Sequence, residues 1–485
     1  MTRRTRIGLY CGALALVVAL LALLGTGSRN RSSLQSYQAE LRARGEKLTF
    51  EDLERSRSAC TNDSMAALSN AVSMLGIPQI NPGSVELRKY VGPGRARLCW
   101  KGPSPSWTSN TYSDPQPAWA QLAEQITAAQ PALSELREAL RDPRASSGPC
   151  TNLMTGPPSN FVAVRKAAQW LMNAALYEAR QGHTEEALQN LEAIASLAQL
   201  DREEYTLVAQ AIRVAVANLG LGASWEVLQA PGWTDPQLER LQKAWQVIHP
   251  VAAIESAFVG YRAYAGALDK LARKSGLRQT APFTGISLSP KGSAQGMLAD
   301  YLWFPIYRLT SINSDALFHL KLTEEAVTGL RMVEAHRPWK EAKQHIDQPT
   351  AWIKQVDSFP GKFRYWISLT SFPNPQRITT NAVRAETERQ LTLAAIAVKR
   401  YQLRHSAPPP SLEALTPELL PAVPYDPMSG KTLCYRLKPH GGFLLYSVGE
   451  DGKDDGGDPR PSSGNTYGLW EGRDVVWPTA ADQDR

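Results

Sequence analysis

The sequence predicts a mainly α-helical protein with an N-terminal transmembrane helix, a helical body and a small α+β region with a short antiparallel sheet at the C-terminal end. Three observations support this fold class. An uncharged apolar run lies near the N-terminus, helical periodicity dominates the middle, and two short alternating segments flank a pair of glycines near the C-terminus. The chain has 485 residues, too many for one hydrophobic core, so we expect several domains.

The apolar run comprises residues 7–26, which contain no charged side chain and follow Arg3, Arg4 and Arg6. As a helix with a rise of about 1.5 Å per residue, these twenty residues span roughly 30 Å, the thickness of a bilayer's hydrocarbon core. We therefore expect residues 1–6 in the cytoplasm and residues 7–26 as a transmembrane helix. The protein would then be a single-pass protein of the inner (cytoplasmic) membrane with the bulk of the chain extracytoplasmic.

Two features of this segment leave alternatives open. Gly25 and Gly27 have the spacing that signal peptidase uses, so cleavage competes with retention. We favour retention because the apolar run exceeds the roughly 7–15 residues usual in a signal peptide. Arg29 and Arg31 follow the segment and nearly balance the positive-inside rule, so the expected orientation rests on the position of the segment at the start of the chain.

Residues 27–150 are predicted to form a stalk and a region rich in proline and glycine. The stalk would be an amphipathic helix over residues 28–56, interrupted at Gly45. Its apolar residues at helical spacing are Leu34, Tyr37, Leu41 and Leu48. Residues 78–117 are rich in proline, glycine and serine, which predicts loops with one short strand.

Residues 151–250 predict a helical region in which one hairpin stands out, AQWLMNAALYEARQGHTEEALQNLEAIASLAQ. The large, small, turn, small and large residues of this hairpin are Leu171, Ala175, Gly182, Ala187 and Leu191. In this pattern the hairpin resembles a tetratricopeptide repeat, although Glu178 stands where the repeat usually has an aromatic residue. One repeat cannot bury its own apolar face, so we expect two further helices, near residues 203–219 and 236–248, to pack on it.

Residues 251–375 predict a second helical region. Its segment MLADYLWFPIYRLTSI is aromatic and apolar but is interrupted by Asp300, Pro305 and Arg308, which makes it too short and too polar to cross a bilayer. We expect this segment in a buried core. Its cluster of aromatic residues keeps a membrane-surface contact open as the alternative. These residues are Tyr301, Trp303, Phe304 and Tyr307.

Residues 376–459 contain the most specific pattern of the chain. A helix ending near Arg400 and Tyr401 precedes a proline-rich loop, two short strands and an acidic glycine-rich loop. The characteristic elements are Pro410-x-Leu412, Val423-Pro424-x-Asp426-Pro427 with Gly430, and Tyr446-Ser447-x-Gly449-x-Asp451-Gly452. This module resembles the globular head of a major type II secretion pseudopilin.

The remaining residues, 460–485, form a tail. Its segment DVVWP predicts an edge strand added to the module, because it is rich in β-branched and aromatic residues. We expect the final residues, TAADQDR, to be disordered.

The pseudopilin resemblance implies a calcium ion in the loop after the last strand. The loop EDGKDDGGD places five carboxylates within nine residues, and calcium accepts six to eight oxygen ligands without strict geometry. The candidate metal ligands are Ser447, Asp451, Asp454, Asp455 and Asp458. A solvated acidic turn is the alternative, since the spacing matches no EF-hand.

Two departures separate the chain from a true pseudopilin. Residues 7–26 contain no acidic residue and no prepilin cleavage site, and some 350 residues separate this segment from the head-like module. We therefore interpret the module as a reused head at the end of a helical exported body. The whole arrangement resembles exported, membrane-anchored proteins of planctomycete and verrucomicrobial type, a resemblance that implies no particular activity.

No motif in the sequence predicts catalysis. The chain has no GxSxG, HExxH, phosphate-binding loop or dinucleotide fingerprint, so we expect no enzyme, no catalytic residue and no cofactor-binding residue. The net charge of +7 comes from dispersed lysines and arginines, which argues against nucleic-acid binding. Beyond Cys11, the cysteines at 60, 99, 150 and 434 permit two disulfides in three pairings, or free thiols.

These observations favour a membrane-anchored extracytoplasmic scaffold or interaction protein of the cell envelope. Its expected partners are the membrane, through the N-terminal helix, and proteins that the sequence does not identify. Two alternatives remain: a component or client of a type II-like secretion or pilus assembly, and an exported hydrolase without a recognisable motif.

Overall fold

The computed structural model describes residues 28–54, 62–75, 88–101, 116–141, 161–200, 202, 204–284, 288–439, 442–464 and 466–481. Within these ranges the chain is mainly helical, with a short antiparallel sheet in its C-terminal region, as the sequence predicts. Residues 1–6 and the predicted transmembrane helix 7–26 lie outside the described residues.

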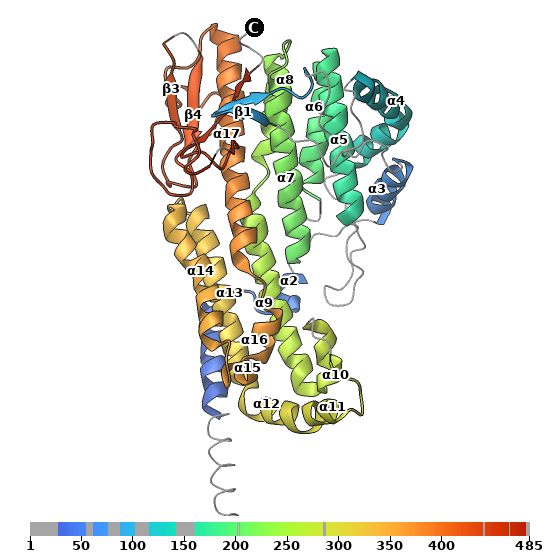
Figure 1. Ribbon diagram of the computed structural model, residues 1–485, viewed down its shortest axis with the longest axis vertical. Coiled ribbons are helices and arrows are strands. Elements are labelled where there is room, and N and C mark those ends of the chain that lie inside the picture. Colours follow the sequence, from blue (N-terminus) through green and yellow to red (C-terminus); the bar gives the residue numbers. More distant parts are fainter. Residues whose placement is uncertain are drawn as a thin grey trace, which may run out of the picture. The chain divides into compact units, whose positions relative to one another are not determined.

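The chain forms two compact units, and each unit combines segments that are distant in sequence. Unit 1 comprises Met1–Arg57, Phe258–Thr328 and His345–Gln376, and unit 2 comprises Ser58–Ala257, Gly329–Gln344 and Arg377–Arg485. The predicted divisions at residues 150, 250 and 375 follow the order of the chain. The units do not, because helices α9, α13 and α14 each contribute residues to both (Figure 1).

The described residues of unit 1 form helices joined by turns and loops, without strands. Besides a helix over residues 28–43 it contains α2 (Phe50–Glu54), the later part of α9 (Pro250–Lys274), α10 (Leu277–Thr280), η2 (Ala281–Phe283), α11 (Ala294–Leu298), the π-helical turn η3 (Ala299–Trp303), α12 (Phe304–Thr310), most of α13 (Ile312–Glu334), the later part of α14 (Trp339–Val356), α15 (Gly361–Arg364) and α16 (Trp366–Ser371).

The helix over residues 28–43 packs within unit 1 and does not stand apart as a stalk. Its leucines and Leu48 form a buried cluster with Leu320 of α13. The buried guanidinium of Arg262 on α9 is held by Glu46, at 2.5 Å, and by Glu324 of α13, at 3.0 Å. The predicted break is confirmed, since Gly45 has a φ of +80° directly after this helix.

Unit 2 contains α3 (Asn62–Met74), β1 (Lys89–Gly92), β2 (Arg95–Arg97), α4 (Gln116–Ala139), α5 (Phe161–Gln181), α6 (Thr184–Leu197), α7 (Leu207–Leu228), α8 (Asp235–Gln246), α17 (Pro375–His405), η4 (Glu413–Leu415), β3 (Cys434–Leu437), β4 (Phe443–Ser447), β5 (Val475–Val476) and β6 (Thr479–Ala480). The region predicted as loops with one strand therefore holds a two-stranded hairpin, β1–β2, and the start of α4.

The predicted helical hairpin is present as α5 and α6. All four of its characteristic leucines and alanines are fully buried. At the turn, Gly182 has a φ of +80°, its N–H donates to the carbonyl of Ala179, and the N–H of His183 donates to the carbonyl of Glu178. This pair of hydrogen bonds is a Schellman motif, which requires a left-handed residue where Gly182 stands. The two further helices are present as α7 and α8.

Helix α7 is the one described helix that is long and apolar enough to cross a membrane by length and composition. Most of its residues are buried in the core of unit 2, where the indole N–H of Trp225 donates to the carbonyl of Pro478 at 3.0 Å. Its apolar character is therefore explained by packing inside the protein.

Gly220 of α7 packs against the side chains of Trp245 on α8 and Ile194 on α6. A Cβ atom at this position would lie 2.4 Å from Cη2 of Trp245 and 2.7 Å from Cγ2 of Ile194. We expect Gly220→Ala to lower the free energy of unfolding by about 1–3 kcal/mol, because an overpacked core must shift. Gly266→Ala in α9 is the control: there the nearest atom would be a carbonyl oxygen at 3.4 Å, and the better helix propensity of alanine should leave stability unchanged or raised. Equal denaturation midpoints for Gly220→Ala and Gly266→Ala would contradict the close packing at Gly220.

Two three-stranded sheets complete unit 2. In the C-terminal sheet β3 pairs antiparallel with β4, and β4 pairs antiparallel with β5, so the predicted edge strand in DVVWP is confirmed. In the other sheet β1–β2 is joined by β6, which runs parallel to β2. The prediction of a disordered tail is therefore wrong for Thr479 and Ala480, which form β6. Residues 482–485 lie outside the described residues.

Candidate functional site

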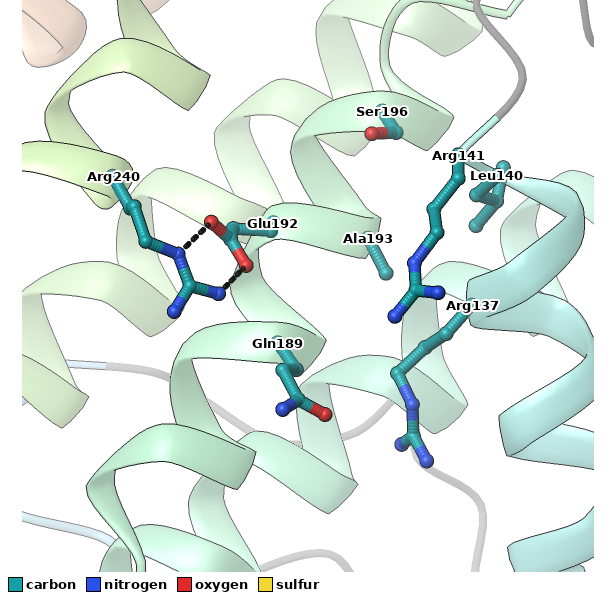
Figure 2. A pocket seen from close by; sticks show the side chains of 8 residues that line it. All are labelled: Arg137, Leu140, Arg141, Gln189, Glu192, Ala193, Ser196 and Arg240. Atoms are coloured by element: carbon teal, nitrogen blue, oxygen red, sulfur yellow. Dashed lines mark hydrogen bonds and ion pairs between the residues drawn. The ribbon is translucent and has the colours of Figure 1, made fainter. Parts of the chain in front are cut away.

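A pocket of about 170 Å³ opens between α4, α6 and α8 of unit 2 (Figure 2). Its lining residues are Arg137, Leu140, Arg141, Gln189, Glu192, Ala193, Ser196 and Arg240. Three arginines against one glutamate give it a positive character. Small-molecule sites usually measure roughly 300–1,000 Å³, so the volume suits a single charged group or side chain better than a whole metabolite.

Helix α6 supplies the floor of the pocket through one of its faces. Gln189, Glu192, Ala193 and Ser196 follow the spacing i, i+3, i+4 and i+7, which places them in line on one side of a helix. The opposite side of α6 carries leucines buried in the core, for example Leu191. The amphipathic pattern that buries α6 thus also forms the polar floor.

Arg137 lies in the last turn of α4 and is held in place by neutral acceptors. Its guanidinium donates to Oδ1 of Asn190 at 3.0 Å and to Oγ of Ser134 at 3.1 Å. Asn190 is itself buried, and its amide donates to the carbonyl of Glu186 at 2.9 Å. Burial lowers the pKa of Arg137, and the nearby Glu178 opposes this effect. The cation is therefore partly desolvated, and the groups that hold it are uncharged.

The opposite wall is electrically neutralised. Arg240 of α8 makes a bidentate pair with Glu192, at 3.0 and 2.6 Å, and a further bond to Glu185 at 2.6 Å. These bonds, first the one to Glu192, raise the pKa of Arg240 above its ordinary value. Bidentate pairs of this kind fix a side chain geometrically. Arg240 and Glu192 therefore form a rigid wall and leave little positive charge for a ligand.

Arg141 lies two residues beyond α4 and extends beside Arg137 on the same side of the pocket (Figure 2). It pairs with Glu138, but both side chains are largely exposed, and such surface pairs contribute about 0–1 kcal/mol. Arg141 can therefore exchange this partner at little cost. Two adjacent guanidinium groups, one fixed and one adjustable, can bind a carboxylate or another oxyanion through charge-assisted hydrogen bonds.

The five residues predicted as metal ligands do not converge in the structure. Ser447 donates to Asp426 at 2.6 Å, Asp451 accepts from the N–H of Lys453 at 3.0 Å, and Asp454 accepts from the hydroxyl of Tyr446 at 2.9 Å. Within the described ranges no group of three His, Cys, Asp or Glu side chains is placed to hold a metal ion.

Asp458, the fifth candidate, is paired with two arginines. It binds Arg460 at 2.8 Å and Arg473 at 3.3 Å, and the hydrogen bond from Arg460 is the main cause that lowers the pKa of Asp458 to about 2. The N–H of Asp455, in contrast, donates to Asp474 at 3.4 Å. Calcium binding stays a prediction that the structure does not test.

Asp474 organises the acidic loop, a role that the sequence reasoning missed. Besides the N–H of Asp455, its carboxylate accepts the N–H groups of Gly457, at 2.7 Å, and Asp458, at 3.1 Å. The backbone N–H groups of the acidic loop therefore point toward the carboxylate of Asp474. An acidic residue directly before the strand signal VVW was the sequence feature that could have indicated this contact.

Asp426 is the second residue that the sequence reasoning missed as a functional group of the module. Its buried carboxylate accepts the hydroxyl of Ser447, and also the N–H of Met428 at 3.0 Å and the N–H of Val448 at 3.1 Å. Ser429 adds a hydroxyl donor at 3.2 Å. The motif Val423-Pro424-x-Asp426-Pro427 thus places an acceptor that joins the loop after Pro424 to the end of β4.

Unit 1 contains a buried serine–histidine contact that bears on the hydrolase alternative. Oγ of Ser368 lies 3.4 Å from Nδ1 of His319, but its hydrogen bond to Oδ1 of Asp315 is shorter, 2.5 Å. All three side chains are buried. The order of contacts is aspartate–serine–histidine, whereas a catalytic triad requires the histidine between the serine and the aspartate.

The carboxylate of Asp315 has a structural task in this cluster. It accepts the N–H groups of Ile367, at 2.7 Å, and Ser368, at 3.1 Å, which lie in the first turn of α16, and the hydroxyl of Tyr307 at 2.7 Å. An anion at a helix N-terminus satisfies donors that have no partner within the helix. Asp315 therefore connects α16 to α13.

Cys434 is the cysteine of the C-terminal sheet. Cys434 is a free, half-buried thiol in β3, so the pairings that use it are not formed. Burial raises the pKa of this thiol and thus keeps it protonated near neutral pH. Cys11, Cys60 and Cys150 lie outside the described residues.

Comparison of the chain with protein-family models, with curated proteins and with solved structures found no match.

Proposed function

We propose that the protein is a membrane-anchored extracytoplasmic scaffold whose helical layer binds an acidic group of a partner protein in the pocket between α4, α6 and α8. The observation that carries this proposal is the pair Arg137 and Arg141, one fixed by neutral acceptors and one held only by an exposed ion pair. The small volume of the pocket supports an anchoring side chain or a chain-terminal carboxylate as the bound group.

The proposed anchor is the segment of residues 7–26. The support comes from the sequence: twenty residues without a charge follow three arginines. The apolar helix α7 does not compete for this role, because its side chains pack in the core of unit 2. The anchor would place both units at the outer surface of the cytoplasmic membrane.

A peptide-binding experiment tests the pocket. The full-length chain in lipid nanodiscs is titrated into two fluorescein-labelled peptides of equal length, one rich in glutamate with a free α-carboxylate, the other with glutamines and an amidated end. We expect binding of the acidic peptide, weakened by added salt because the pocket is open to solvent. Combined Arg137→Gln and Arg141→Gln should weaken it at least about tenfold, the value of one charge-assisted hydrogen bond.

Arg337→Gln is the control for loss of a surface charge, since it removes one positive charge from unit 2 outside the pocket, where the double variant removes two inside it. Arg337 is exposed and pairs with Glu341 at 2.6 Å, so its loss should change the affinity less than about twofold. An equal loss in the control, or equal binding of both peptides, would show that the pocket does not recognise an acidic group.

A component or client of a type II-like secretion assembly is the second candidate. It is supported by the order of elements in the C-terminal module: the long helix α17 shares a buried core with a following antiparallel sheet, through residues such as Val398, Leu445 and Val475. This candidate predicts specific co-purification of the full chain with pseudopilin subunits. A partner whose binding survives the Arg137 and Arg141 substitutions but not changes on the exposed face of β3, for example Leu437→Asp, would favour it over the pocket.

A further inference from the structure

The segment over residues 294–310, formed by α11, η3 and α12, is amphipathic and lies at the edge of unit 1. We call it the interfacial segment. Its inner side carries Phe304 and Tyr307, whose rings lie 6.0 and 5.7 Å from the ring of Trp366 on α16. Trp303 adds an edge contact to the same indole at 5.1 Å. The segment is therefore held firmly on one side by a buried aromatic cluster.

The outer side of the interfacial segment is apolar and uncovered. Its exposed side chains are Met297, Leu298, Tyr301, Leu302, Ile306 and Leu309, between 38 and 79 % exposed. The expectation of a buried segment is confirmed for Phe304 and Tyr307, which are core residues. It is wrong for Tyr301, which is exposed. Six large apolar side chains gathered on one face of a short segment exceed the scattered exposure normal for a soluble surface.

The segment and the loop before it carry two exposed basic side chains and one acidic side chain, which is paired. Within the segment the acidic side chain is Asp300, and it is paired with Arg278 at 2.7 Å. Lys291 and Arg308 are exposed beside it. The guanidinium of Arg308 donates to the carbonyl of Arg273. An apolar face bordered by basic groups suits the boundary between headgroups and acyl chains of an anionic bilayer.

The interfacial segment ends close to the start of the helix over residues 28–43, which follows the predicted membrane span. Nδ2 of Asn30 donates to the carbonyl of Thr310, the last residue of α12, at 3.4 Å. Asn30 stands four residues after the end of the predicted membrane span, a distance of about 6 Å along a helix. Figure 1 shows the helix over residues 28–43 beginning beside α12. The end of α12 is thereby tied to the point where the chain would leave the bilayer.

We propose that the interfacial segment lies in the surface of the bilayer, with its six apolar side chains at the level of the acyl chains and Arg29, Arg31, Lys291 and Arg308 among anionic lipid headgroups. This inference rests on the proposed anchor, since residues 7–26 supply the membrane that the segment touches. The segment and the anchor would together hold unit 1 to the membrane at two points and fix its orientation.

Thiol labelling in nanodiscs tests this assignment. Leu302→Cys and Leu403→Cys are made separately in the full-length chain, incorporated into nanodiscs of phosphatidylethanolamine and phosphatidylglycerol, and treated with a charged, membrane-impermeant maleimide. Leu302 and Leu403 are similarly exposed, at 53 and 48 %, and Leu403 lies in unit 2. Peptide mass spectrometry reports the labelling rate at each site. We expect the thiol introduced by Leu302→Cys to react at least about tenfold more slowly.

A second variant links protection to the apolar face. Adding Leu298→Ser and Leu309→Ser to Leu302→Cys should restore labelling, because each buried leucine changes a partition equilibrium by about tenfold or more. Discs of neutral phosphatidylcholine should give intermediate protection, since the basic border then has no anionic partner.

The outcomes separate the two proposals. If the labelling rates at the two sites agree within about twofold while the protein stays in the discs, the interfacial location of the segment is refuted. The proposed anchor is not affected by that result. Protection confined to discs that hold two chains assigns the face to a second copy and also overturns the lipid assignment. A chain that elutes from size-exclusion chromatography without lipid overturns the anchor, and with it the inference.

Discussion

Asp315→Asn should lose stability when the pH is lowered from 6 to 4. In the native protein the opposite effect of Asp315 cancels this loss. Burial raises the pKa of Asp315 from its ordinary 3.8 to about 6, and burial lowers the pKa of His319 from 6.5 to about 3. The two side chains belong to one buried cluster, joined through Ser368. Their contributions to stability therefore vary with pH over the same range but with opposite sign.

The signs follow from proton binding in the folded and unfolded states. Between pH 4 and 6 the folded protein keeps the proton of Asp315 and the unfolded chain has lost it, so this group makes stability fall as pH rises. In the same range the unfolded chain carries the proton of His319 and the folded protein does not, so this group makes stability rise. Each contributes about 1.4 kcal/mol per pH unit, and the two nearly cancel.

In Asp315→Asn only the histidine is left, and we expect about 3 kcal/mol to be lost between pH 6 and pH 4 relative to the native protein. In His319→Gln only the aspartate is left, and stability should instead rise by about the same amount over that interval. Urea denaturation at several pH values measures both, and differences from the native chain cancel titrations elsewhere. Parallel pH profiles of stability for the native protein and both variants would contradict the opposite pH dependences of Asp315 and His319.

Replacing Asp426 by alanine should destabilise the C-terminal module strongly. Four donors lose their acceptor, among them the buried N–H groups of Met428 and Val448. A buried donor left without a partner costs about 1–3 kcal/mol, so the total should reach about 3–5 kcal/mol in the free energy of unfolding. Thermal and chemical denaturation of the full-length chain measure the change.

Asp451→Ala is the matched control, because Asp451 is exposed and accepts one backbone N–H. Without calcium we expect its stability to match that of the native protein. Repeating both melts with calcium and with chelator also tests the predicted calcium ligands: stabilisation by calcium that disappears in Asp451→Ala would support them. A melting temperature for Asp426→Ala equal to that of Asp451→Ala would refute the organising role of Asp426.

Local patterns in the sequence predicted those parts of the fold that depend on neighbouring residues. The α5–α6 hairpin was predictable because Gly182 and the small alanines specify a turn and a close helix pair within one stretch of chain. The strands β3 and β4 were predictable for the same reason. Local patterns failed at His336, which lies in the region predicted to be helical. This residue forms the turn between α13 and α14 with a φ of +56°, and its ring stacks on Tyr425.

The candidate pocket could not be found from the sequence, because its residues come from three segments. Arg137 and Arg240 are separated by about a hundred residues, and no spacing rule connects them. The one local signal was the polar face of α6 opposite its leucines, a pattern that every surface helix shows. The division into two units could not be predicted from the sequence either, because long helices such as α9 contribute residues to both units.

The pairing of β6 with β2 bears on when unit 2 can fold. Thr479 and Ala480 pair with Arg95 and Ala96, so this sheet joins strands that lie far apart in the sequence. Until β6 is present, β2 has an unpaired edge, and the indole of Trp225 lacks its acceptor at Pro478. Completion of unit 2 must therefore wait until residues 478–480 have been synthesised. A chain truncated before Pro478 should therefore lack both β6 and the acceptor of Trp225.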